Sequence, residues 1–336
     1  MKPIVSIITP TFNQEQYIEA CIKSVLFQTI KEWEMIIVDD GSTDNTPSII
    51  RRFDDSRIVY IPGAHKGIAC LGENYCNALN RSTGEFILIL DGDDYIPPNR
   101  LEIQLPVFED RRIVLSHGRY AYVFDKKTVI YPTLFGSDIL NNQPLGSALK
   151  AFLQGFNPIG AQSVMVRKSA LLEMGGFTQL PYLPLVDYPT WMKLSLVGPF
   201  RYIPEVLGYW RRHSLSITIN QGEHIINGYM RYGDEFVDSF HEKLAALGLT
   251  RFVEKRGGIA HLSLAWIKLS NRDWDKALGL AKKSWEFRED VSWSFRIKML
   301  ITLIGAYLHL DTPRFFKGMM KLIYQKDPQG ISSIRF

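Results

Sequence analysis

Three short segments, apolar throughout except for Ser6, constrain the fold of this chain more than any other feature. They span residues 4–8, 35–38 and 86–90, and each runs directly into polar, turn-forming residues. Unbroken hydrophobicity in place of alternation is typical of strands covered on both faces, as in a parallel sheet flanked by helices. Such sheets bind ligands at the carboxyl ends of their strands. We therefore expect the three polar clusters to converge on one ligand.

The third segment ends in the acidic stretch Asp91-Gly92-Asp93-Asp94. Two carboxylates at positions i and i+2, where a buried strand ends, can face the same space. Hard oxygen ligands of this kind are what Mg²⁺ and Mn²⁺ prefer, commonly together with phosphate. Solvated loops often carry the same pair, so its interpretation depends on the two neighbouring clusters.

Strand and helix patterns alternate through the first part of the chain, which predicts an α/β domain. Helices are expected between the apolar segments, for example near residues 14–29 and 67–80, and two further strands are expected at residues 114–118 and 120–124. Farther along, strand patterns vanish and apolar residues recur at helical spacing. We predict two domains, residues 1–220 and residues 221–336, of which the second is wholly helical.

The composition is ordinary for a globular protein, since 46% of the 336 residues are hydrophobic and 22% are charged. The net charge of +4 is small and the basic residues are spread along the chain, which argues against a nucleic-acid partner. The three cysteines, Cys21, Cys70 and Cys76, are too few for a disulfide framework, and their odd number fits a reducing compartment. Buried thiols are a better interpretation of Cys70 and Cys76 than metal ligands.

The first residues lead straight into a strand pattern rather than into the apolar stretch of a signal peptide. The sequence also has no run of about 20 apolar residues that could span a membrane. We expect a cytoplasmic protein, either free or peripheral at the inner face of the plasma membrane.

Five segments together resemble the family 2 inverting glycosyltransferases, whose nucleotide-sugar domain has the GT-A fold. They are residues 6–13, 37–44, 84–94, 175–177 and 209–213. Each segment is short, but their order and spacing are specific. The resemblance implies a Rossmann-like α/β fold with a mixed, mostly parallel sheet flanked by helices, followed here by a C-terminal all-helical extension.

The resemblance assigns a nucleotide-sugar donor, most simply a UDP-sugar, to the first two polar clusters. It makes Phe12 the aromatic that stacks on uracil, although a phenylalanine at this place can also be a core residue. Pro10 and Thr11 would line the same pocket through backbone contacts. Asp40 would accept the N–H of the base, while the Asp39-Asp40 pair can also serve as a helix N-terminal cap.

The resemblance also implies a Mn²⁺ or Mg²⁺ ion at the acidic stretch. Asp93 would be a direct ligand, Asp91 would contact the ribose or the metal and its water, and Gly92 would lie against the donor. Arg211 would neutralise charge on the diphosphate, and His213 would bind the metal or a phosphate. A lone histidine is usually structural, so the role of His213 depends on these neighbours.

An inverting transfer needs one general base, which removes the proton of the acceptor hydroxyl as that hydroxyl attacks the anomeric carbon. The family often writes this segment Glu-Asp-Tyr-Asp-Leu-Trp, and its second acid, the base, matches Asp187. Val186 stands where the family has the preceding Glu, which leaves a single candidate. Asp187 can also cap the helix that begins there, and the two roles are compatible.

Two further loops are expected beside the donor and the acceptor. His65-Lys66-Gly67 resembles the family's Asn-X-Gly loop, which would bring Lys66 and Gly67 toward the diphosphate. The family's following Ala-Arg-Asn is absent, so sugar contacts of this segment are not carried over. Residues 155–162, with Asn157, are expected on the acceptor side.

The helical region has two interpretations. Its helices either pack on the catalytic domain or form a membrane-surface platform for a lipid-linked acceptor. The second interpretation rests on basic residues that surround apolar ones: Arg296, Arg314, Lys317, Lys321 and Lys326 around Phe315, Phe316, Met319 and Met320. Most basic faces are simply solvated, so both interpretations stay open.

The predicted function is transfer of a sugar from a nucleotide-sugar donor to a hydroxyl of a saccharide or lipid-linked saccharide, in surface polysaccharide or glycolipid synthesis. One alternative is a sugar-nucleotide pyrophosphorylase, which usually carries a Gly-rich basic loop where residues 10–13 stand here. The other is a non-catalytic nucleotide-binding scaffold, which would not need a general base and metal ligands in the same site.

Overall fold

The computed structural model describes residues 2–124, 127–131, 135–213, 221–254, 256–290 and 293–313. The chain forms two compact units. The first holds the described residues from 2 to 149 and from 157 to 213. The second holds residues 150–156 and the described residues from 221 onward. A short segment from the middle of the first unit's sequence therefore belongs to the second unit, which the sequence pattern does not indicate.

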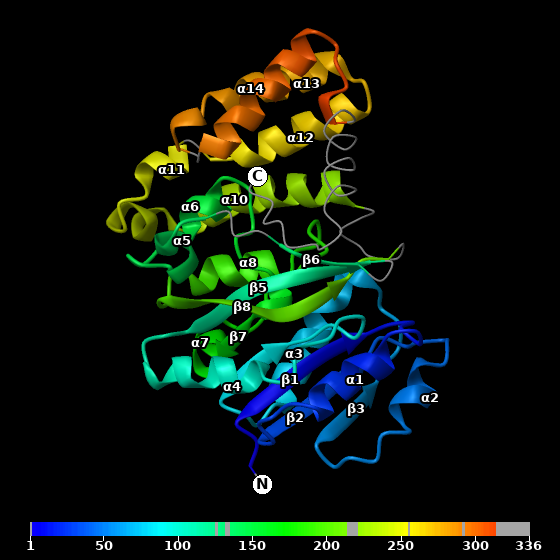
Figure 1. The fold of residues 1–336 in the computed structure, drawn as a ribbon. Helices are drawn as coiled ribbons and strands as arrows, with labels where there is room; N and C mark the ends of the chain where they lie inside the picture. Colours follow the sequence, from blue (N-terminus) through cyan, green and yellow to red (C-terminus); the bar gives the residue numbers. More distant parts are fainter. Residues whose placement is uncertain are drawn as a thin grey trace. The chain divides into compact units, whose positions relative to one another are not determined.

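The first unit is built on an eight-stranded sheet, counted over the described residues (Figure 1). Its strands follow the order β3-β2-β1-β4-β7-β5-β6, and β8 pairs with β5. The pairs among β1 to β4 and the β5–β8 pair are parallel, whereas β7 pairs antiparallel with β4 and β5, and β6 with β5. The strands are β1 (Val5–Thr11), β2 (Trp33–Asp39), β3 (Ile58–Pro62), β4 (Phe86–Ile89), β5 (Leu115–Phe124), β6 (Lys127–Ile130), β7 (Met165–Arg167) and β8 (Phe200–Arg211).

The parallel strands β1, β2 and β3 end at paired positions on one edge of the sheet. This brings together the polar residues that follow them. Thr11 of β1 lies opposite Asp39 of β2, and Asp39 lies opposite Pro62 of β3. The N–H of Asp40 donates to the carbonyl of Thr11 at 2.9 Å just beyond the paired strands. The loops after these strands therefore start from one edge of the sheet.

Helices cover the sheet on both faces. Alternate side chains of β1, β2 and β4 form a hydrophobic core with α1, α2 and α4, while α3 contacts β1 and β2. The helices of this unit are α1 (Ile18–Leu26), α2 (Thr46–Ile50), α3 (Leu71–Arg81), α4 (Arg100–Gln104), α5 (Ser137–Asn141), α7 (Lys168–Glu173) and α8 (Asp187–Leu194), with 3₁₀ turns η1 (Ile68–Cys70), η2 (Leu105–Glu109) and η3 (Ala161–Ser163). The predicted mixed, mostly parallel sheet flanked by helices is confirmed.

Where the pattern suggests separate strands at residues 114–118 and 120–124, the structure has the single strand β5. Its pairing with β8 shifts register on both sides of Arg119. A Cβ atom on Gly118 would lie 2.6 Å from the carbonyl oxygen of Ile203, so β8 can approach only a glycine here. The polar break in the sequence is a bulge, not a strand end.

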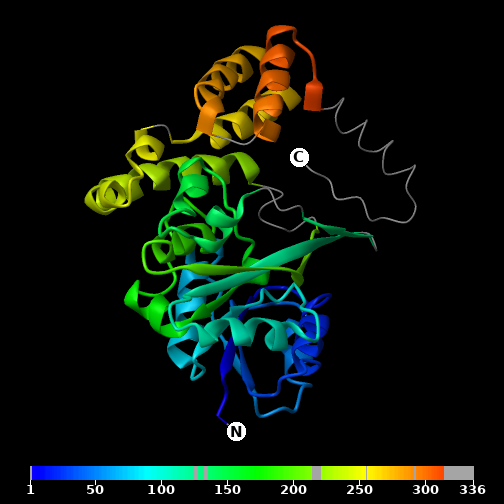
Figure 2. The same cartoon turned by 60° about the vertical axis from the view of Figure 1, so that its left-hand side comes forward.

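The second unit is helical throughout its described residues, as predicted (Figures 1 and 2). It contains α10 (Gly222–Ala246), α11 (Thr250–Glu254), α12 (Gly258–Ser270), α13 (Trp274–Trp285), η4 (Arg288–Asp290) and α14 (Trp293–Tyr307), and the chain first enters it within α6 (Leu149–Leu153). Leu269, Ala277 and Ala306 form a small buried cluster shared by α12, α13 and α14. Among the described helices, none combines the length and apolar character that a membrane crossing requires.

Gln154 completes the N-terminus of α12 inside this unit. Its side-chain oxygen accepts the N–H of Gly258 at 3.0 Å, and its carbonyl accepts the N–H groups of Ile259 and Ala260. These are N–H groups that have no partner within a helix. The basic and apolar residues of the predicted membrane platform, apart from Arg296, lie outside the described residues.

Candidate active site

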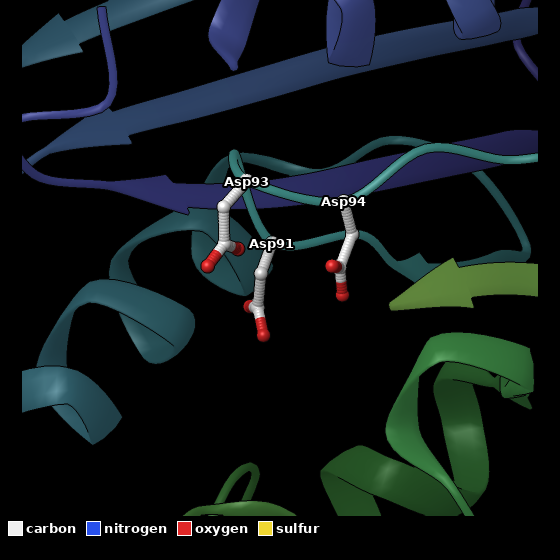
Figure 3. A group of neighbouring side chains, drawn as sticks. All are labelled: Asp91, Asp93 and Asp94. Carbon is white, nitrogen blue, oxygen red and sulfur yellow. The ribbon is translucent and has the colours of Figure 1, made fainter. Parts of the chain in front are cut away.

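The acidic stretch after β4 presents three carboxylates to one space. The ligand atoms of Asp91, Asp93 and Asp94 all lie within 4.8 Å of one another, and Figure 3 shows the side chains leaving the loop toward the same side. Burial and the charge of Asp93 raise the pKa of Asp91 to about 7, and burial raises the pKa of Asp94 well above its ordinary value. A cation among these groups would offset the cost of their negative charge.

Residues at the end of β8 hydrogen-bond to this stretch, although the two segments are more than a hundred positions apart in the sequence. The N–H of Arg211 donates to Asp94 Oδ1 at 2.9 Å, and its Nη1 donates to the carbonyl of Asp93 at 2.7 Å. His213 Nε2 lies 3.0 Å from Asp93 Oδ2. Of the predicted metal-binding residues, the structure thus groups Asp91 with Asp93 and brings His213 to Asp93, and it places Arg211 beside the same stretch.

Two tyrosine rings hold these basic groups in place. The ring of Tyr17 stacks on His213 with centroids 4.8 Å apart. The guanidinium of Arg211 lies 4.5 Å from the ring of Tyr95 and 5.6 Å from that of Tyr17. Such contacts between a cation and an aromatic face stabilise the orientation of both groups. Arg211 is therefore positioned at the acidic stretch, while its contact with a diphosphate stays a prediction.

The donor atoms suit the predicted metal. Asp91, Asp93 and Asp94 offer carboxylate oxygens, which Mg²⁺ and Mn²⁺ both accept. His213 adds an imidazole nitrogen beside Asp93.

Gly92 packs closely against side chains at and just after the end of β1. A Cβ atom on Gly92 would clash with Gln14 Oε1 and would lie 2.8 Å from Thr11 Oγ1. The N–H of Gly92 donates to the carbonyl of Pro10 at 3.2 Å, which ties the stretch to the end of β1. Gly92 therefore has a structural role here, and direct contact with a donor stays a prediction.

Asp187 begins α8 and offers one unpaired oxygen. Asn157 Nδ2 donates to its Oδ2 at 2.8 Å, whereas its Oδ1 is buried without a hydrogen-bond partner among the described residues. Burial raises the pKa of Asp187 to about 6. The charge of Asp187 in turn raises the pKa of Asp91, so the two carboxylates lie close enough to influence each other.

Asp40, directly after β2, is surrounded by hydrogen-bond donors. The N–H of Gly67 donates to its Oδ2 at 3.0 Å, and the N–H of Lys66 donates to its Oδ1 at 3.2 Å. Asn74 Nδ2 lies 3.3 Å from Oδ1, and His65 Nδ1 lies 2.8 Å from Oδ2. The helix-cap alternative for this carboxylate is wrong, because its donors come from the loop after β3 and from α3.

The remaining predicted base-binding residues follow β1. Phe12 is 37% exposed, so the core alternative does not hold, and its ring stacks on that of His65 with centroids 4.1 Å apart. Pro10 and Thr11 are buried, and their carbonyls accept N–H groups of the neighbouring loops. The ammonium of Lys66 is engaged by Glu73 at 2.6 Å, so its contact with a diphosphate stays a prediction.

A comparison with models of protein families identifies the family of this chain. The model of the family "Glycosyl transferase family 2" matches residues 6–173. The chain belongs to glycosyl transferase family 2. The family match favours the predicted glycosyltransferase over a pyrophosphorylase, because the matched family is one of glycosyl transferases.

Two curated glycosyltransferases each match about two thirds of the chain. TuaG of Bacillus subtilis (strain 168), whose name places it in teichuronic acid biosynthesis, is 33% identical over 66% of this chain and 83% of its own length. The Escherichia coli enzyme WfaP, named as a UDP-Glc:alpha-D-GlcNAc-diphosphoundecaprenol beta-1,3-glucosyltransferase, is 29% identical over 66% of this chain and 83% of its own length.

Solved structures confirm the GT-A fold of this family member. S. aureus TarS 1–349 in complex with UDP-GlcNAc matches with a TM-score of 0.55 at 18% identity, over 95% of this chain and 92% of that one. The mannosyltransferase PcManGT from Pyrobaculum calidifontis, in complex with GDP-Man and Mn²⁺, matches with a TM-score of 0.56 at 18% identity, over 92% and 87%. At these identities the likeness shows the fold alone.

Sequence reasoning missed three residues of this family 2 site. Tyr75 of α3 donates a short hydrogen bond to Asp91 Oδ1, Tyr17 supports His213, and His65 covers the ring of Phe12. The signal for Tyr75 was available, since it lies on the inward face of an amphipathic helix next to the sheet. Tyr17 and His65 make contacts that no local pattern encodes.

Proposed function

We propose that this family 2 glycosyltransferase is an inverting, metal-dependent enzyme that uses a UDP-sugar. The name of WfaP specifies a UDP-Glc donor, and TarS was solved with UDP-GlcNAc, which supports a UDP-sugar. PcManGT was solved with GDP-Man and Mn²⁺, which supports the metal and makes a GDP-sugar the alternative to test. The residues Asp91, Asp93 and His213 would hold the ion.

The observation that carries the proposal is the state of Asp187. Its Oδ1 is shielded and unpaired, its Oδ2 is held by Asn157, and its pKa of about 6 leaves it ionised but basic near neutral pH. A general base works best with a pKa near the operating pH. The acceptor oxygen would bond to the anomeric carbon as its proton passes to Asp187 Oδ1 and the bond to the diphosphate breaks.

The leaving diphosphate would develop negative charge next to the acidic stretch. A metal ion bound there supplies Lewis-acid stabilisation of that charge. Asp93 and His213 would hold the ion, and Asp91, kept in place by Tyr75, would orient it or the ribose. Arg211 adds a fixed positive charge beside the same loop.

We also propose the first unit as the catalytic domain and a hydroxyl of a saccharide or lipid-linked saccharide as the acceptor. The names of TuaG and WfaP, one in teichuronic acid biosynthesis and one acting on a diphosphoundecaprenol-linked sugar, support a role in surface polysaccharide or glycolipid synthesis. Such a role would place the protein in the cytoplasm or at the inner face of the plasma membrane.

A thermal-shift screen of UDP, GDP and dTDP, each with and without Mn²⁺, tests the donor proposal. We expect UDP to raise the melting temperature only when Mn²⁺ is present, because binding to the native state stabilises it by mass action. Stabilisation by GDP or dTDP alone would replace the proposed donor within the same enzyme class. A folded protein that responds to no nucleotide would contradict the proposal.

A further inference from the structure

The contacts of His65 at the base end of the site match those proposed for a nucleobase. Its ring lies flat on Phe12, with centroids 4.1 Å apart and planes 15° apart. Its Nδ1 lies 2.8 Å from Asp40 Oδ2, and it hydrogen-bonds to the backbone carbonyl oxygen of Asp40 at 3.1 Å. A ring stacked on Phe12 with a nitrogen beside the Asp40 carboxylate is also the placement that the proposed function gives to uracil.

A base cannot join His65 on this face of Phe12. Stacked atoms approach to about 3.5 Å, so a ring between two others needs about 7 Å between the outer pair. The observed 4.1 Å leaves no room for it. Either His65 leaves or the base binds elsewhere.

The hydrogen bonding of Asp40 leads to the same conclusion. A carboxylate has about four lone-pair sites. Among the described residues, Lys66, Gly67 and Asn74 donate hydrogen bonds to it, and His65 Nδ1 lies 2.8 Å from its Oδ2. An N–H of a base that approaches Oδ2 from this side therefore meets the His65 ring.

His65 is the neighbour of this carboxylate best placed to leave. The Lys66 and Gly67 donors are backbone N–H groups, and the Asn74 amide belongs to helix α3. The side chain of His65 is 52% exposed, while that of Asp40 is only 8% exposed. The imidazole can therefore rotate into solvent without unfolding its loop.

We propose that His65 occupies the nucleobase position of the free enzyme and must be displaced by the incoming base. This inference rests on the proposed function, because it takes Phe12 and Asp40 as the base-binding pair. Displacement makes His65 a specificity-determining residue. A ligand that stacks on Phe12 and donates an N–H to Asp40 replaces the contacts that are lost when His65 leaves. A ligand without a base makes neither contact, so it gains nothing by displacing His65.

Calorimetric titrations with UDP and with pyrophosphate, both with Mn²⁺, test this exchange in the full chain. We expect His65→Ala to bind UDP about three- to tenfold more tightly than the wild type, since an aromatic pair worth about 0.5–1.5 kcal/mol no longer competes. Pyrophosphate binding should not change, because it has no base. His224→Ala, at an exposed position of α10, is the matched control and should behave as the wild type.

His65→Phe guards against an effect of the alanine on the loop, because it keeps the stacking and removes the N–H. It should tighten UDP binding less than His65→Ala does. In the wild type, the His65 imidazole resonances, assigned by their loss in the variant, should shift with Mg²⁺ and UDP but not with Mg²⁺ and pyrophosphate.

Two results would overturn the displacement of His65 while leaving the proposed function intact. One is UDP binding that is unchanged or weaker in His65→Ala, and the other is a His65 resonance that does not shift in a protein that binds UDP. Failure of both proteins to bind any nucleotide would instead overturn the proposed function, and this inference with it.

Discussion

The candidate site has a base end, around Phe12 and Asp40, and an acidic end, around residues 91–94 and Asp187. The two ends differ in how completely their carboxylates are stabilised by neighbouring groups. At the base end, the Asp40 carboxylate accepts hydrogen bonds from Lys66, Gly67 and Asn74, and its Oδ2 lies 2.8 Å from the imidazole of His65. At the acidic end, burial raises the pKa of Asp91 to about 7 and that of Asp187 to about 6. The carboxylate at the base end has its hydrogen-bond partners without a ligand. At the acidic end, burial destabilises the ionised form of the carboxylates.

This difference indicates two ways of binding. A ligand at the base end must exchange with a group that is already there, so its net gain is small and depends on shape. A cation at the acidic end removes mutual repulsion and desolvation cost, so its gain is large and depends on charge. We expect base recognition to supply selectivity and the acidic end to supply most of the affinity.

The largest effect should come from Asp187→Asn. Loss of the general base should lower kcat by about 10²–10⁴-fold, with little change in UDP affinity. The same variant should be more stable above pH 6, by about 3 kcal/mol, because it removes a charge whose pKa the fold has raised from 3.8 to about 6. Steady-state kinetics and chemical denaturation measure the two effects, with the exposed Asp275→Asn as control. Unchanged kcat would exclude Asp187 as the base.

A matched pair of variants at the two ends should separate charge from shape. Asp93→Asn should weaken binding of Mn²⁺ with pyrophosphate about 100-fold, because it removes both a ligand charge and the partner of His213. Asp40→Asn should leave this binding unchanged and weaken UDP binding about tenfold. Titration calorimetry with both ligands gives the comparison. Equal effects of both variants on pyrophosphate would show that the two ends do not act separately.

The pH dependence of kcat/KM should follow the ionisation of Asp187. An acceptor proton can pass only to the carboxylate form, which is lost as the pH falls through about 6. Below that value, the rate should fall tenfold for each pH unit. The measurement is a rate profile from pH 5 to pH 8 at saturating Mn²⁺. A profile that is flat down to pH 5 would contradict the assignment.

The smallest effect should come from Tyr75→Phe. This variant removes the hydroxyl that donates to Asp91 Oδ1, so the charged form of Asp91 loses a stabilising hydrogen bond. We expect Mn²⁺ to bind several-fold more weakly while UDP selectivity over GDP is unchanged. Titration of Mn²⁺ measures the effect, and Tyr307→Phe, at a position 75% exposed, is the control. A change in base selectivity would mean that Tyr75 links the two ends.

The sequence predicted the parts of the fold that depend on local pattern. Continuous apolar segments identified β1, β2 and β4, because strands buried on both faces need such residues. The acidic stretch was predicted because its carboxylates follow a buried strand directly. Even the bulge in β5 had a local mark, Gly118, although the pattern suggested a strand end there.

What the sequence did not predict depends on contacts between distant residues. Asn157 and Asp187 are 30 positions apart, and Tyr75 and Asp91 are 16 apart. Nothing near Asn157 indicates which carboxylate its amide will hold. The stacking of His65 on Phe12 likewise arises only because the parallel strands before them end level with one another.

The placement of residues 150–156 has a consequence for protein engineering. A chain cut after residue 220 keeps Gln154 but loses α12, whose first N–H groups Gln154 accepts. A helical fragment made alone lacks the segment that completes that helix. During synthesis, Gln154 leaves the ribosome 104 residues before Gly258. A chimera that exchanges the helical region with that of a relative therefore needs its crossover points on both sides of residues 150–156 as well as near residue 220.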